Sequence, residues 1–68
     1  MPSTVIRFSR YDSSTRQLLI GFQSGRNYIY HDVPEETANG LKAAFSKGVF
    51  FNNHIRDRFR FTERRSAG

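Results

Sequence analysis

The chain has 68 residues, and its 11 basic and 6 acidic side chains give a net charge of +5 at pH 7. This length allows one small domain and excludes TIM barrels and two-layer dinucleotide-binding folds. The absence of cysteine excludes disulfides, thiolate metal sites and a cysteine nucleophile. A domain of this size buries only about 60% of the surface that its unfolded chain exposes. The 7 Phe and 3 Tyr must therefore supply much of the core.

Apolar and polar residues alternate in the first half of the chain, which predicts β-strands over residues 4–11, 17–23 and 27–32. Short oxygen-bearing side chains at 12–15 and the pair Ser24-Gly25 are typical of the intervening turns. Turns this short favour an antiparallel meander. Within each strand we expect one face to carry the following apolar side chains: Ile6 with Phe8, Leu18 with Ile20 and Phe22, and Tyr28 with Tyr30.

The period changes at Pro34, and we predict a helix from there to about Gly48. Pro34 fits the first helical position, where its missing N–H is no loss, and Glu35 and Glu36 suit the positive end of the helix dipole. Gly40 weakens this helix by about 1 kcal/mol relative to Ala, so the helix needs tertiary support. Its apolar stripe is expected to contain Ala38, Leu41, Ala44 and Phe45.

Two patterns overlap after Gly48. Phe51, Ile55 and Phe59 recur every four residues, which predicts a second short helix. Alternation between Arg and Phe over residues 56–61 instead predicts a terminal strand, and a helix through about Ile55 followed by an extended tail satisfies both. The expected fold is α+β, a three-stranded antiparallel β-meander followed by an α-helix and a shorter second helical segment. Residues 1–61 form a single domain in this prediction, and 62–68 form a flexible basic tail.

The residues typical of catalysis are few. No HExxH, GxSxG or P-loop motif occurs, and His31 and Asp32 are neighbours on a predicted strand, so they point to opposite faces. His54 and Asp57 can meet across one helical turn, but a surface hydrogen bond explains that pair without a third positioned group. We therefore predict no enzyme, no catalytic residue, no cofactor and no metal site.

Nine of the 11 basic residues are Arg, which suits bidentate contacts to phosphate. Tyr28 and Tyr30 share a strand face and can stack on successive bases, or they can close the core with their hydroxyls at the rim. The Arg residues near the C-terminus can contact a phosphate backbone, or they can form a solvated edge that blocks sheet aggregation. The predicted nucleic-acid-binding residues are Arg26, Tyr28, Tyr30, Lys47, Arg56, Arg58 and Arg60.

The predicted function is therefore a non-catalytic module for RNA or single-stranded nucleic acid. The alternative is a protein-interaction module that binds an acidic partner through a sheet edge or an exposed Phe, with Phe50 as an anchor unless Phe50 forms a second core contact. No apolar run approaches 18 residues and no signal peptide opens the chain, so we expect a cytoplasmic protein with no membrane partner.

The order and spacing of these landmarks resemble the KTSC domain, a segment found at the C-terminus of some lysyl-tRNA synthetases and as small bacterial proteins. The matching residues are Tyr11-Asp12, Leu18-x-Ile20-x-Phe22, Gly25, Tyr28-x-Tyr30, Val33-Pro34, Leu41, Ala44, Ser46-x-Gly48, Phe51-Asn52 and Ile55-Arg56. Ser9-Arg10 and Thr37-Ala38 depart from the family pattern, and Phe59 stands where Tyr is common. The resemblance implies the same small fold, transfers no catalytic residue, and carries a suggestion of RNA binding from the synthetase context.

Overall fold

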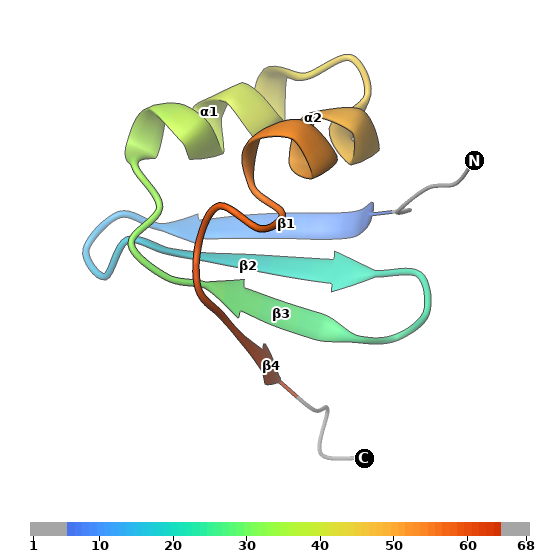
Figure 1. The fold of residues 1–68 in the computed structure, drawn as a ribbon, viewed down its shortest axis with the longest axis horizontal. Helices are drawn as coiled ribbons and strands as arrows, with labels where there is room; N and C mark the ends of the chain where they lie inside the picture. Colours follow the sequence, from blue (N-terminus) through green and yellow to red (C-terminus); the bar gives the residue numbers. More distant parts are fainter. Residues whose placement is uncertain (1–5, 65–68) are drawn as a thin grey trace.

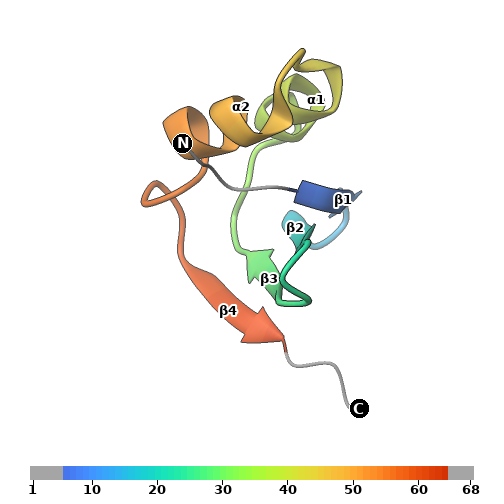
Figure 2. The ribbon, with the colours of Figure 1, turned by 90° about the vertical axis from the view of Figure 1, so that its right-hand side faces the viewer.

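The structure is a computed structural model that describes residues 6–64. Along the chain it contains β1 (Ile6–Asp12), β2 (Gln17–Phe22), β3 (Asn27–Tyr30), α1 (Glu35–Ala43), α2 (Lys47–His54) and β4 (Phe61–Arg64). The strands form one antiparallel sheet in the order β1-β2-β3-β4. Both helices lie on one face of this sheet, over β1 and β2, and β4 lies farthest from them (Figures 1 and 2).

The register of β2 against β3 explains where the core sits. Leu18 is opposite Tyr30 and Ile20 is opposite Tyr28, so these four side chains share the face that the helices cover. Leu18, Ile20 and Tyr30 are buried there together with Phe22. The faces predicted for these two strands are therefore confirmed. The tight turn at Asp12 is confirmed as well, because the Ser14 hydroxyl and backbone N–H both donate to its Oδ1, at 2.7 and 3.0 Å.

β1 differs from its prediction. Ile6 is opposite Phe22, but Phe8 is opposite Gly21, so the register shifts by one residue between them. A bulge of this kind moves the following side chain to the other face. Phe8 therefore lies on the side away from the helices, where its ring occupies the space that a Cβ on Gly21 would fill. The prediction that Ile6 and Phe8 share a face was wrong.

The predicted first helix divides into two. α1 begins at Glu35 after Pro34 and buries Ala38 and Leu41, but it ends at Ala43 instead of near Gly48. The Ser46 hydroxyl accepts a hydrogen bond from the Val49 N–H at 3.4 Å and caps the start of α2. Phe45 lies in the connection between the helices with its side chain fully exposed, so the prediction that it joins the apolar stripe was wrong.

α2 is followed by a turn and then by a strand. Phe51 and Ile55 are buried against the sheet, and Phe59 is partly buried beside them. The sheet has four strands instead of the predicted three, because β4 pairs with the open edge of β3. Thr62 to Arg64, expected in the basic tail, are thus the last residues of β4, whereas residues 65–68 lie outside the described part of the chain. Phe50 packs on the core cluster, which confirms it as a core contact.

Candidate nucleic-acid interface

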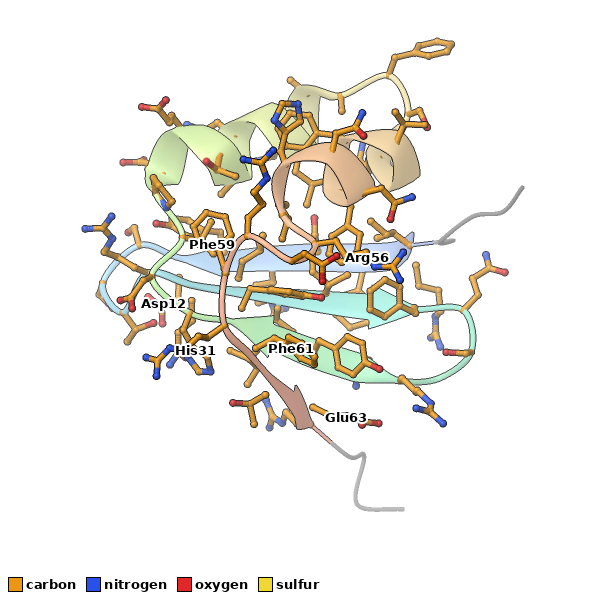
Figure 3. The ribbon with its side chains drawn as sticks, viewed as in Figure 1. Asp12, His31, Arg56, Phe59, Phe61 and Glu63 are labelled. Carbon is orange, nitrogen blue, oxygen red and sulfur yellow. The ribbon has the colours of Figure 1, made fainter. Side chains whose placement is uncertain are left out.

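A groove of about 620 Å³ opens on the helix side of β3 and β4. In Figure 2, β4 lies well away from both helices. Its aromatic lining comes from three strands and from α2, and consists of Phe22, Tyr28, Tyr30, Phe51 and Phe61. Figure 3 shows Phe61 lying over β3, Arg56 beyond the end of α2, and Glu63 farther along β4. We call this feature the aromatic groove.

The rings of the aromatic groove contact one another in a continuous chain. Phe61 packs on Tyr28 and on Tyr30, with centroid distances of 5.2 and 5.5 Å. Tyr28 meets Phe22 edge to face at 5.3 Å, and Tyr30 meets Phe51 in the same way at 5.4 Å. Contacts at these distances are favourable beyond the area that they bury. The rings therefore brace one another on the sheet.

Exposure differs sharply among these rings. Tyr30 is 3% exposed and forms the floor of the groove, so its ring faces are already occupied by core contacts. Tyr28 is half-buried, and Phe61 is 55% exposed. Phe61 was absent from the predicted site although it offers the largest accessible ring of the groove. Its alternation with Phe59 was visible in the sequence, but that pattern does not say which side of the strand is open.

Charged side chains border the aromatic rings on two sides. Arg26, in the β2–β3 hairpin, lies 3.8 Å from the Glu63 carboxylate, measured from Nη1 to Oε2. A side-chain hydrogen bond to Tyr28 and then the charge of Glu63 raise the pKa of Arg26. Arg56 and Asp57 come from the turn after α2 and line the groove at its helix side. The aromatic groove therefore has a cation at each border.

The Tyr30 hydroxyl at the buried floor of the groove keeps its proton, and so stays neutral, over a wide pH range. Burial, followed by the nearby Tyr28, raises the pKa of Tyr30 to about 12. The charges of Arg56 and Asp57 act on this hydroxyl in opposite directions, since the cation lowers its pKa and the carboxylate raises it. Both charged side chains of the turn are thus close enough to the floor to influence it.

The structure brings four of the seven predicted site residues to this groove, namely Arg26, Tyr28, Tyr30 and Arg56. Arg58 and Arg60 line a shallow neighbouring hollow that shares Asp57 and Phe61 with the groove. Lys47 is not in either lining. Its ammonium group instead donates to the carbonyl oxygens of Lys42 and Ala44, at 3.3 and 3.4 Å, and so satisfies the end of α1.

The histidines have structural neighbours within residues 6–64. The His54 ring lies on Phe50 with a centroid distance of 4.4 Å, and His31 Nε2 is 2.9 Å from Thr62 Oγ1. No three His, Asp or Glu side chains among residues 6–64 gather in a way that would hold a metal ion. Over the same residues, neither helix has the length and apolar character needed to cross a membrane.

Comparison with known proteins agrees with the resemblance seen in the sequence. The family model of the KTSC domain matches residues 2–59. A protein of Tsukamurella paurometabola is 38% identical over 58 residues, which cover 85% of this chain and 87% of that protein. A lysine–tRNA ligase of Nostoc punctiforme is 38% identical over 60 residues, and one of Trichormus variabilis is 36% identical over 58. The chain spans only 11% and 10% of the lengths of these two ligases.

The same fold is found in a crystal structure. The KTSC domain protein of Yersinia pestis superposes with a TM-score of 0.84 at 34% sequence identity, over 94% of this chain and 90% of that protein. Sequence and structure thus point the same way across nearly the whole chain. This protein belongs to the KTSC domain family.

Proposed function

We propose that this chain is a non-catalytic module that binds single-stranded nucleic acid, with RNA as its ligand, in the aromatic groove. The observation that carries the proposal is the exposed Phe61 ring, which is braced on Tyr28 and lines the same groove as Arg26 and Arg56. A base stacks on an accessible aromatic ring with about 1–3 kcal/mol of stabilisation, and Arg side chains beside the ring contact the adjoining phosphates. Tyr30 supports the site from below instead of stacking.

The family context supports the same ligand class. Relatives that contain a segment similar to this chain are named lysine–tRNA ligases, and that name includes an RNA substrate. Arg58 and Arg60 lie in the adjoining hollow and extend the basic surface beyond the groove. An RNA strand with one base stacked on Phe61 can therefore continue along the protein surface past Arg58 and Arg60. We accordingly propose that the module acts in the cytoplasm.

The proposal is tested by fluorescence anisotropy with a labelled single-stranded RNA pool at about 50 mM salt, where phosphate contacts are strongest. We expect dissociation constants in the micromolar range. Phe61→Ala should weaken binding about 5- to 150-fold, the equivalent of one lost stacking contact. Phe45→Ala is the matched control, since it removes an even more exposed ring that lies outside the groove and should leave the affinity unchanged. Undetectable binding at low salt would contradict the proposal.

The salt dependence of the affinity reports how many RNA phosphates the protein contacts. Two phosphates neutralised by Arg26 and Arg56 give a log–log slope of about −1.4, and four, with Arg58 and Arg60, give about −2.8. Arg56→Gln should make the slope shallower by about 0.7. Lys47→Gln removes the same charge outside the groove and should leave the slope unchanged.

A protein partner is the second candidate. All four residues of β4 are exposed along an open edge of the sheet, and Phe45 offers a fully exposed ring. An acidic partner that docks on these features would bind with a shallow salt dependence, because an aromatic anchor is little affected by screening. Phe45→Ala would then weaken binding, whereas the same substitution should leave RNA binding unchanged.

A further inference from the structure

One side chain of the aromatic groove is unexplained by phosphate binding. Asp57 lines the groove beside Arg56, and a carboxylate repels a phosphate backbone. The other carboxylate beside these aromatic rings, Glu63, is engaged by Arg26. Within residues 6–64, by contrast, Asp57 forms no hydrogen bond or ion pair. The groove thus presents a free acceptor pair next to its aromatic rings.

The position of Asp57 is fixed by the turn that ends α2. The N–H groups of Ile55 and Arg56 both donate to the Phe51 carbonyl oxygen, at 2.9 and 2.8 Å, and the Arg58 N–H donates to the Ile55 carbonyl oxygen at 3.0 Å. Asp57 lies between these bonds with a φ of 64°, in the left-handed region. Aspartate is one of the few non-glycine residues that adopt this region readily, so the turn holds the Asp57 backbone without large strain.

We infer that the aromatic groove selects guanine, with Asp57 accepting from the N1–H and N2 amino groups while Arg56 donates to O6. The inference rests on the proposed function, because it names the base that the same site takes. The guanine ring stacks on Phe61, and its hydrogen-bonding edge then meets Asp57 and Arg56, which line the helix side of the groove. Single-stranded ligands allow this contact because their base edges are free.

Only guanine among the four RNA bases matches a carboxylate and a guanidinium side by side. Its edge offers two adjacent donors followed by an acceptor, which suits the two oxygens of Asp57 and the donors of Arg56. Adenine and cytosine place a ring nitrogen acceptor next to their amino donor, so one carboxylate oxygen would face a lone pair. Uracil has one donor between two acceptors. Each mismatch leaves a polar group of the site unpaired, which is costly.

The test uses labelled uridine nonamers with a central guanosine, inosine or adenosine, measured by anisotropy at one low salt concentration. We expect the guanosine strand to bind about tenfold tighter than the adenosine strand, because a bidentate contact discriminates by about 1–3 kcal/mol. Inosine lacks the N2 amino group but keeps N1–H and O6, so it should fall between the two.

Two variants assign the preference to Asp57. Asp57→Asn should bring the affinities for guanosine and adenosine strands together, and Asn tolerates a positive φ, so the turn should keep its conformation. Asp32→Asn is the matched control, because Asp32 is also an exposed aspartate with a positive φ of 57° but lies outside the groove. That variant should keep the full preference.

The outcomes separate this inference from the function on which it rests. Equal binding of the guanosine, inosine and adenosine strands, still weakened by Phe61→Ala, would overturn guanine selection and leave the proposed function standing. A guanine preference that persists in Asp57→Asn would overturn the role of Asp57. Absence of binding to any of the strands would overturn both proposals together.

Discussion

The covered and uncovered halves of one sheet face differ in burial although their sequences alternate in the same way. On β2, Leu18 is 2% exposed beneath the helices, whereas on β4, Phe61 is 55% exposed on the same side of the sheet. The two helices are short, with 9 and 8 residues, and lie over β1 and β2. Each step between strands also adds about 20–25° of twist, which carries β4 away from the helices (Figure 2).

The difference explains why a small domain has an aromatic groove at all. A protein of this size has few apolar side chains, and most of those on the covered half are buried in the core. On the uncovered half the rings are held by one another instead, through Tyr28, Tyr30 and Phe61. The covered half therefore provides the stability, and the uncovered half provides the accessible surface.

The largest expected effect on stability comes from shortening one apolar side chain in each half of the sheet face to alanine. Leu18→Ala should lower the free energy of unfolding by about 2–5 kcal/mol, because it leaves a cavity beneath the helices. Phe61→Ala should cost about 1 kcal/mol, since half of that side chain is already in water and only ring contacts are lost. Urea unfolding followed by circular dichroism measures both values. Similar losses for the two variants would contradict the division between the halves.

A smaller effect tests how tightly the helices pack on each other over the covered half. A Cβ on Gly40 would lie 2.6 Å from the tip of the Phe50 ring, so Gly40→Ala should destabilise the protein although Ala favours helices. In a Phe50→Ala background the ring that a Cβ on Gly40 would meet is absent, so Gly40→Ala should raise the free energy of unfolding by about 1 kcal/mol. Thermal unfolding of the four proteins in this double-mutant cycle measures the change of sign. A destabilising Gly40→Ala in both backgrounds would refute the contact.

A further effect, which appears only at alkaline pH, comes from the boundary between the halves, where Tyr30 is the floor of the groove. Its pKa is raised from 10.0 to about 12 on folding, mainly by burial. Below pH 10 both states keep the proton and the contribution to stability is complete. Between pH 10 and 12 the unfolded chain loses the proton first, so the free energy of unfolding falls as the pH rises.

The alkaline titration of tyrosine absorbance checks this assignment. Tyr30→Phe should remove the step near pH 12 and flatten the stability profile above pH 10. The variant should otherwise fold normally, because the ring contacts to Phe51 and Phe61 remain. A step near pH 12 that survives in Tyr30→Phe would show that another group titrates there.

Local sequence patterns predicted the covered half better than the uncovered one. The alternation of Leu18, Ile20 and Phe22 identified the core face of β2, because a period of two depends only on the strand itself. The bulge that turns Phe8 away is an irregularity of pairing, and alternation carries no sign of it. Phe45 was misplaced because the Ser46 cap starts a new helix where the apolar spacing suggested a continuing one.

The candidate site was predicted in part for a related reason. Residue type and charge identified Arg26, Tyr28 and Arg56, which the structure brings to one groove. Phe61 was missed because its exposure depends on where two distant helices end, and β4 itself forms by pairing with residues that lie 31 to 37 positions earlier in the chain. Arg58 and Arg60 were selected by charge alone, and their placement in the adjoining hollow depends on the turn after α2.

We propose that the uncovered half of the helix-side face binds single-stranded RNA. The most direct measurement is a titration of the ¹⁵N-labelled protein with a guanosine-containing RNA nonamer, followed by two-dimensional NMR. We expect the shifted amides to cluster around Arg26, Tyr28, Arg56 and Phe61. Shifts confined to the opposite face of the sheet, around Leu19 and Ile29, or no shifts at millimolar RNA, would contradict it.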